Sequence, residues 1–170
     1  SAYTFTLRGD VTFSTGAPFD ATAAKANLDR WLTRTPAGNY PYVPALWGGF
    51  ADQVDSSGAP LSNVQSVSAP APDTLVIQLR RPDAGLPATL AMPAFAMVDP
   101  TAWVDGFGSQ GTPSAGTGPF RLRAWAQPDL VELERNPAYW SQPATVDSLR
   151  FKIVADDAQR IIALQVDELD

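Results

Sequence analysis

The first residues of the chain alternate between hydrophobic and polar side chains. Tyr3, Phe5 and Leu7 are each separated by one polar residue, and this period of two predicts a β-strand with one apolar face. Gly9 and Asp10 follow directly and predict a turn. The chain therefore opens on a strand that covers a hydrophobic core from one side.

From residue 20 onward, the hydrophobic spacing becomes that of a helix. Asp20 and Thr22 are both residue types that cap the N-terminus of a helix, and the pattern predicts a helix that continues to about Leu32. The residues that this helix would bury are Ala24, Leu28, Trp31 and Leu32.

The next part of the chain is punctuated by residues that favour turns. Residues 34–49 are rich in proline, glycine and aromatic side chains, a composition typical of an irregular loop. We expect a short helix over 45–54 and a turn over 55–60. The stretches 64–69 and 74–79 have the pattern of strands and are joined by a short Pro-containing segment, which predicts a β-hairpin.

Shorter elements are predicted between residues 86 and 118. Residues 86–91 have the pattern of one or two helical turns, and 95–98 form an apolar run that predicts a strand. The dipeptide at 99–100 is Asp-Pro, which predicts a capped segment. Residues 106–118 are rich in glycine and predict a loop.

The C-terminal part returns to the alternating pattern. Residues 120–124 and 131–134 predict two half-exposed strands around a turn at 127–129. A third strand is predicted over 149–154 and a helix over 156–166. Together, the elements predict an α+β fold of antiparallel strands and short helices.

Composition narrows the range of functions. The chain has 170 residues, 45% of them hydrophobic, which is enough for one or two small cores. Its net charge of −6 argues against nucleic acid or an anionic membrane as a partner. It has no Cys and no His, which excludes thiolate nucleophiles, imidazole bases and zinc sites with nitrogen or sulfur ligands. No stretch approaches the about 18 consecutive apolar residues of a membrane-spanning helix.

Two carboxylates could be read as catalytic acids. Glu132 and Glu134 lie on the same face of a predicted strand, whereas a glycosidase places two carboxylates on opposite sides of its substrate. We expect them instead to pair with Arg121 and Arg123 on the neighbouring strand. This interpretation makes them a solvated ladder of ion pairs.

Three further motifs have ordinary structural interpretations. Residues 8–10 read Arg-Gly-Asp, the tripeptide of integrin ligands, but Gly-Asp is a common turn pair. Residues 116–119 are glycine-rich but lead into a predicted strand, whereas a phosphate-binding loop opens a helix. The two aspartates at 156–157 are explained by helix capping, so we expect no metal site there.

Several motifs occur together and in order along the chain. They are the opening stretch 3–20, the strand 73–79, the Gly-Thr-Gly-Pro-Phe motif at 116–120, the segment 132–140 that ends Arg-Asn-Pro-Ala-Tyr-Trp, and the end 163–170. In this order and spacing, the chain resembles the extracellular solute-binding proteins of family 5. These receptors of ABC importers handle oligopeptides, dipeptides and nickel chelates.

The resemblance implies a particular domain organisation. Residues 1–115 would form the small α+β subdomain of the first lobe of a type II periplasmic-binding-protein fold. Residues 116–170 would form part of the central sheet of that lobe and a helix, and the second lobe would be absent from this chain. The chain would therefore be an internal fragment of a longer protein.

The resemblance also implies a function. The protein would be the substrate-binding component of an ABC importer, with no enzymatic activity and no cofactor or metal. It would be a monomer outside the membrane, periplasmic or anchored by a lipid. It would capture a peptide or similar small solute by lobe closure and deliver it to permease subunits. The alternatives are a self-standing protein-interaction domain and, with less support, a carboxylate-based hydrolase.

Four residues are predicted to line the ligand cleft. Trp47 resembles in position a Trp that nickel-chelate binders place against their ligand, and Tyr42 is similar to a Tyr of peptide-binding members. Ala94 stands where nickel-chelate binders have an Arg that pairs with carboxylates, which argues against a nickel chelate. Phe95 offers an aromatic surface. For Trp47, packing in the core is an equally open interpretation, and for Phe95 it is the favoured one.

Overall fold

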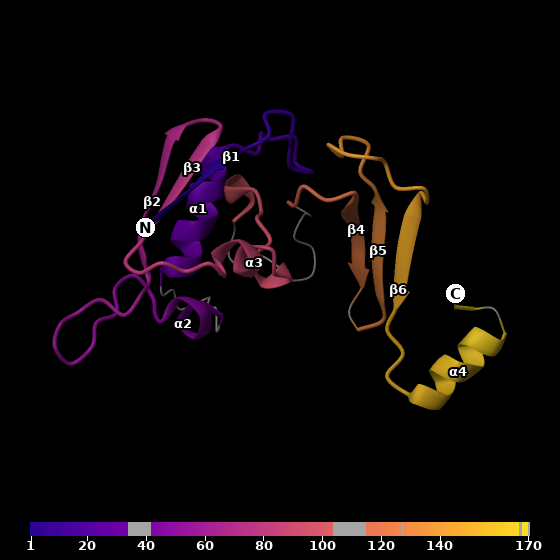
Figure 1. Cartoon of the computed structure of the whole chain (residues 1–170). Coiled ribbons are helices and arrows are strands. Elements are labelled where there is room, and N and C mark those ends of the chain that lie inside the picture. Colours follow the sequence, from indigo (N-terminus) through magenta and orange to yellow (C-terminus); the bar gives the residue numbers. More distant parts are fainter. Residues whose placement is uncertain (34–41, 104–114, 127, 167, 170) are drawn as a thin grey trace. The chain divides into compact units, whose positions relative to one another are not determined.

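The computed structural model describes residues 1–33, 42–103, 115–126, 128–166 and 168–169. The chain divides into two compact units. The first comprises Ser1–Trp103 together with Ala115–Thr117, and the described part of the second begins at Gly118. Each unit contains its own three-stranded sheet (Figure 1). The boundary at residue 115 that we expect between parts of a lobe stays a prediction.

The sheet of the first unit consists of β1 (Ala2–Thr6), β2 (Val64–Ala71) and β3 (Thr74–Leu79). It is antiparallel in the order β1-β3-β2. The central strand alternates as expected for a half-buried sheet, because its buried residues are Leu75, Ile77 and Leu79. The opening strand and the hairpin predicted from the sequence are confirmed.

Helix α1 (Ala21–Leu32) packs against this sheet (Figure 1). Its N-cap is Asp20, whose side chain accepts a hydrogen bond of 2.8 Å from the backbone N–H of Ala23. Such a cap satisfies one of the free amides of the first turn. The buried residues that the spacing predicts, Ala24, Leu28, Trp31 and Leu32, all lie in the core.

Helix α2 (Tyr42–Trp47) is shorter than the sequence predicts. The expected helix over 45–54 is wrong, because the helix ends before Gly48, whose φ is +83°. A Cβ on Gly48 would lie 2.7 Å from the carbonyl oxygen of Leu61, so only glycine fits this close approach. The predicted loop over 34–49 falls partly on 34–41, outside the described residues.

The apolar run after α3 (Leu86–Leu90) is not a strand. The run 95–98 lies between two 3₁₀ turns, because η1 (Pro93–Phe95) ends at its first residue and η2 (Pro100–Ala102) follows it. Val98 donates its N–H to the side chain of Asn27 and accepts from the same side chain, at 3.0 and 2.8 Å. The backbone is therefore satisfied by a buried amide of α1 and needs no partner strand.

The second unit contains a meander of β4 (Phe120–Ala126), β5 (Leu130–Arg135) and β6 (Ser148–Lys152), in the order β4-β5-β6. Helix α4 (Asp157–Gln165) follows β6. The three predicted strands and the helix are confirmed, with ends shifted by a few residues. Residues 104–114 of the predicted loop and residue 127 of the predicted turn are outside the described residues. Among the described helices, none is long and apolar enough to cross a membrane.

Candidate functional site

Two of the four predicted cleft residues are stacked on each other in the core of the first unit. The rings of Trp47 and Phe95 lie 4.8 Å apart at an interplanar angle of 26°. Trp31 of α1 meets Phe95 edge-on, with ring centroids 5.2 Å apart. All three side chains are at most 2% exposed. Offset stacking and edge-to-face contacts of this kind stabilise a core beyond its buried area alone.

Helix α2 divides its side chains between this core and the surface. Val43 and Trp47 are buried at a spacing of four residues, whereas Tyr42 and Leu46 are exposed at the same spacing. Residues four apart lie on one face of a helix, so the two pairs occupy different faces. Tyr42, 45% exposed, is the predicted cleft residue that offers most of its ring to its surroundings.

Ala94 lies in η1, next to Phe95 in the chain. Its side chain is half-buried and packs against the core that contains Phe95 and Trp47. The structure therefore places an uncharged methyl group at position 94, and its predicted place in the cleft stays a prediction.

Trp47 has one unusual polar feature. Its indole Nε1 is buried and has no hydrogen-bond partner among the described residues. A buried donor without a partner costs about 1–3 kcal/mol. The indole N–H is therefore a group that would gain from a partner supplied by a solute or by another segment of the protein.

A buried carboxylate holds the loop next to α1 in place. Asp99 is 1% exposed, and its side chain accepts hydrogen bonds from the hydroxyl of Thr15 at 2.5 Å and from the N–H of Thr101 at 2.9 Å. Burial by itself raises the pKa of Asp99, but the hydrogen bonds from Thr15 and Thr101 lower it, and the net pKa lies below the ordinary value. Sequence reasoning identified Asp99 only as the start of a capped segment.

The same region is joined to the start of the Gly-Thr-Gly-Pro-Phe motif by backbone hydrogen bonds. The N–H of Asp99 donates to the carbonyl of Ala115 at 2.9 Å, and the N–H of Ser14 donates to the carbonyl of Gly116 at 2.8 Å. The motif therefore fixes loops that come from distant parts of the sequence. It leads into β4 and does not open a helix, so it has no phosphate-binding geometry.

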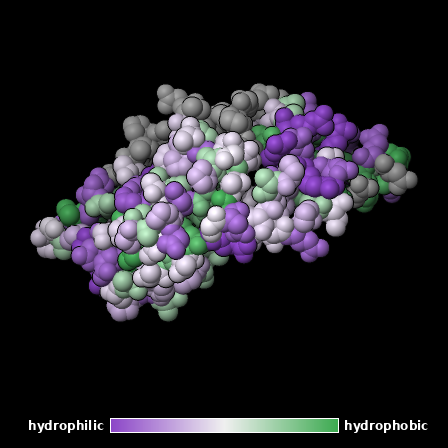
Figure 2. Space-filling view, turned by 90° about the horizontal axis from the view of Figure 1, so that it is seen from above, coloured by the Kyte–Doolittle hydropathy of each residue, from purple (hydrophilic) through white to green (hydrophobic). Residues whose placement is uncertain are grey.

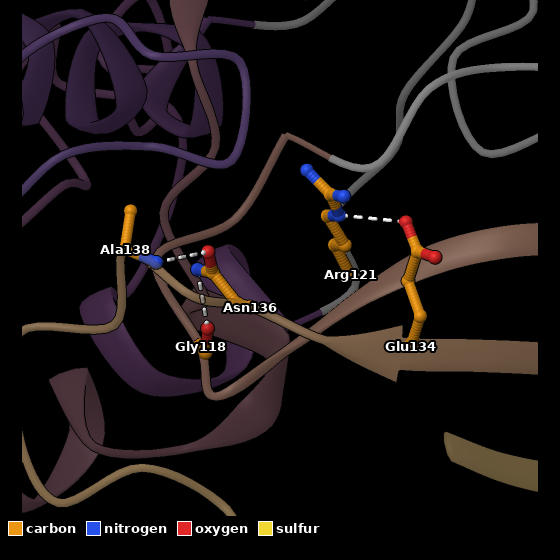
Figure 3. Close-up of polar contacts among 5 residues, drawn as sticks. All are labelled: Gly118, Arg121, Glu134, Asn136 and Ala138. Carbon is orange, nitrogen blue, oxygen red and sulfur yellow. Dashed lines mark hydrogen bonds and ion pairs between the residues drawn. The ribbon is translucent and has the colours of Figure 1, made fainter. Parts of the chain in front are cut away.

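Asn136 connects the two most distinctive motifs of the second unit (Figure 3). It is 3% exposed. Its Nδ2 donates to the carbonyl of Gly118 at 2.9 Å, and its Oδ1 accepts from the N–H of Ala138 at 3.1 Å. Its own N–H donates to the carbonyl of Pro119 at 2.8 Å. A single amide thus holds the Gly-Pro corner against the Asn-Pro-Ala-Tyr-Trp segment.

The two glutamates of β5 form ion pairs and do not face each other across a cavity. Glu134 accepts a hydrogen bond of 2.7 Å from Arg121, as predicted (Figure 3). Glu132 pairs with Arg150 of β6 at 2.7 Å, so its predicted pairing with Arg123 is wrong. The register of β4 shifts between Leu122 and Ala124, and this bulge takes the intervening Arg123 out of line with Glu132.

Other candidate motifs also have structural roles. Arg8 and Asp10 pair with each other at 2.7 Å across the first turn. Asp156 caps α4 by accepting from the N–H of Gln159 at 2.8 Å, and Asp157 pairs with Arg160 in the same helix. Within the described part of the chain, no cluster of three or more His, Cys, Asp or Glu side chains could hold a metal ion.

Comparison with known proteins gives a family match over the complete chain. The model of bacterial extracellular solute-binding proteins, family 5 Middle, matches residues 1–170. The glutathione-binding protein GsiB of Salmonella paratyphi A is 34% identical over 168 residues, which are 98% of this chain and 29% of that protein. GsiB of Shigella flexneri is 34% identical over 169 residues, with the same coverage.

Solved structures agree with this match. NikA from Brucella suis, in complex with Fe(III)-EDTA, is 27% identical and superposes with a TM-score of 0.75 over 99% of this chain and 31% of its own. The periplasmic binding protein DppA from Helicobacter pylori, in complex with the peptide STSA, has a TM-score of 0.80 at 22% identity over 99% of this chain and 34% of its own.

These comparisons confirm the α+β fold of a type II periplasmic-binding protein. The chain spans 29% of the length of the curated GsiB relatives and about a third of the solved structures. The chain belongs to the bacterial extracellular solute-binding proteins of family 5.

Proposed function

We propose that this chain is part of the substrate-binding component of an ABC importer and contributes one wall of its ligand cleft. The observation that carries the proposal is the family match over residues 1–170. A nickel ABC transporter structure from Bacillus halodurans, 26% identical with a TM-score of 0.76, supports the transport role. The full-length protein would act outside the membrane and deliver its solute to permease subunits.

The proposed solute is a small peptide. The glutathione-binding protein GsiB of Salmonella paratyphi A is 34% identical to this chain, and glutathione is a small peptide. Ala94 carries no charge, so the wall lacks an arginine to pair with the carboxylates of a metal chelate. Uncharged and aromatic groups instead favour contact with the apolar and amide parts of a peptide.

The proposed wall consists of the exposed Tyr42 and the half-buried Ala94, with the buried Trp47 and Phe95 as support. Tyr42 is 45% exposed, and Trp47 and Phe95 are 1% and 2% exposed. In this proposal, Tyr42 makes apolar and hydrogen-bonding contact with the solute. The stacked pair gives the wall a rigid support, and the Trp47 Nε1 is a buried donor that has no partner among the described residues.

A role in binding, without catalysis, fits the chemistry of the described residues. The glutamates of β5 are neutralised by Arg121 and Arg150, and Asp99 is enclosed by hydrogen bonds from threonines. None of these three carboxylates faces a second carboxylate across a cavity, as the general acid and base of a hydrolase would. We expect Glu132→Gln and Glu134→Gln to leave solute binding unchanged, and a hydrolase panel to show no activity with the unmodified protein.

Mass spectrometry of the purified full-length protein tests this proposal. The protein is denatured, and the released small molecules are identified and compared with those released by a Tyr42→Ala variant. We expect a short peptide or a peptide-like molecule, recovered in smaller amount from the variant. Recovery of a metal chelate would overturn the peptide assignment, and conversion of an added peptide to cleaved products would overturn the receptor role.

A further inference from the structure

One turn of helix α4 carries large apolar side chains that point to several sides. Ile161, Ile162 and Leu164 are 59%, 57% and 56% exposed. Successive residues of an α-helix are rotated by about 100°, so these three side chains and Ala163 between them point in four different directions. Ala163 is the buried residue of α4. A turn of helix that directs large apolar side chains to several sides is more stable when other parts of the protein cover it.

The apolar surface continues beyond α4 within the second unit. Val166, directly after the helix, is 59% exposed. We name Ile161, Ile162, Leu164 and Val166 the α4 apolar surface. In Figure 2, hydrophobic residues are visible at the right-hand edge, where α4 lies in Figure 1.

A groove runs between α4 and the end of β6. Its volume is about 200 Å³, and its apolar lining is formed by Val154, Ile162, Ala163 and Val166. Lys152 and Glu168 also line it and pair with each other at 3.2 Å. The shape and lining fit one or two aliphatic or aromatic side chains, with the ion pair at the edge of the contact.

We propose that α4 is an interior helix of the full-length protein, enclosed on more than one side by segments that lie outside residues 1–170. Apolar side chains of those segments would fill the groove over Ala163. The chain covers 29% of the length of GsiB, so the relatives have enough further sequence to supply the enclosure. The inference depends on the family match and not on which solute is bound.

Two other occupants explain the surface less well. A lipid surface covers one stripe of a helix and leaves the opposite side in water, and the chain has a net charge of −6, which anionic lipids repel. A second copy of the chain docked on one face would also leave part of the apolar circumference exposed. Enclosure by the protein's own further chain accounts for all four directions.

Cysteine labelling of the full-length protein tests this inference. Ile161, Ile162 and Leu164 are changed to Cys one at a time. Asp147→Cys is the matched control, because the Asp147 side chain is 92% exposed and lies in the same unit. Residues 1–170 contain no Cys, so mass spectrometry of the peptides assigns the label to each new site. We expect a maleimide to react about tenfold or more slowly at the three α4 positions than at 147, and equally fast in urea.

Hydrogen exchange of the unmodified full-length protein gives a second measurement that requires no substitution. A nine-residue helix is marginal in water without tertiary packing, so protected α4 amides indicate enclosure. Labelling at the rate of the control, or unprotected α4 amides, would overturn the inference. Protection that appears only with phosphatidylcholine vesicles, or only at concentrations where the protein dimerises, would also overturn it and identify the other occupant.

Discussion

At the residue scale, buried polar side chains fix the loops of this protein. Asp99, Asn27 and Asn136 are each at most 3% exposed, and each bonds to groups far away in the sequence. Buried polar groups that are fully hydrogen-bonded specify one arrangement of the chain, because any alternative leaves them without partners. These hydrogen bonds therefore fix the positions of the loops, whereas the hydrophobic core fixes the positions of the helices and strands.

We expect Asp99→Ala to destabilise the first unit by about 1–3 kcal/mol, because the Thr15 hydroxyl and the Thr101 amide lose their buried acceptor. Chemical unfolding followed by tryptophan fluorescence measures the change. Asp10→Ala is the control, because the Arg8–Asp10 pair is exposed and its loss should change stability by at most about 0.5 kcal/mol. Equal effects of the two substitutions would contradict the role assigned to Asp99.

The contribution of Asp99 should also depend on pH. Its pKa in the folded protein lies below the ordinary value of 3.8, so the folded state binds this proton less readily than the unfolded state does. The stabilisation is therefore present above pH 3.8 and is lost as the pH falls through the lower, folded value. We expect the stability difference between the protein and its Asp99→Asn variant to be larger at pH 7 than at about pH 3. A stability difference between the protein and the Asp99→Asn variant that increases as the pH is lowered would contradict a lowered pKa of Asp99.

Asn136→Asp should destabilise the corner between the two motifs of the second unit. The substitution keeps the size of the side chain and the acceptor for the Ala138 amide, but an oxygen replaces the nitrogen that donates to Gly118. The lost bond and the carboxylate placed against a carbonyl oxygen should cost about 1–3 kcal/mol. Thermal unfolding by circular dichroism measures it, and an unchanged midpoint would show that the Asn136 amide does not hold this corner.

At the scale of elements, the sequence predicts what depends on local pattern and misses what depends on distant contacts. The strands of both sheets and helix α1 follow from alternation and capping, and the signal is clearest where one face is buried, as in β3 and α1. The run 95–98 has the composition of a strand, but the Asn27 side chain satisfies the Val98 backbone. The local sequence around Asn27 and around Val98 does not predict that contact, because the two residues are far apart in the chain.

The end of α2 also depends on a distant contact, between Gly48 and Leu61. Alanine substitutions at Gly48 and at Gly16 test this contact. Gly48 and Gly16 both have positive φ, +83° and +91°, but a Cβ on Gly48 would meet the Leu61 carbonyl at 2.7 Å, whereas a Cβ on Gly16 meets nothing within 4 Å. Gly16→Ala should therefore cost about 1 kcal/mol from backbone strain alone. Gly48→Ala should cost clearly more, since the Leu61 backbone must also move. Equal losses of unfolding free energy in the two variants, measured by chemical unfolding, would contradict the close approach of Gly48 to Leu61.

At the scale of the whole molecule, the family and its fold could be predicted from the sequence, but the role of single residues in the cleft could not. Trp47 and Phe95 are predicted to lie at a ligand wall, and the structure stacks them in the core. The six-residue α2 has too few turns for its buried face to be deduced from periodicity.

The central claim is that these residues form one wall of a two-lobed receptor that binds a small peptide. Isothermal titration calorimetry of the full-length protein and of the isolated chain 1–170, with the peptide identified by mass spectrometry, tests this claim most directly. We predict saturable binding by the full-length protein and weak or no binding by the isolated chain, because one wall makes only part of the contacts. A sub-micromolar dissociation constant for the isolated chain, or no binding by the full-length protein, would contradict the claim.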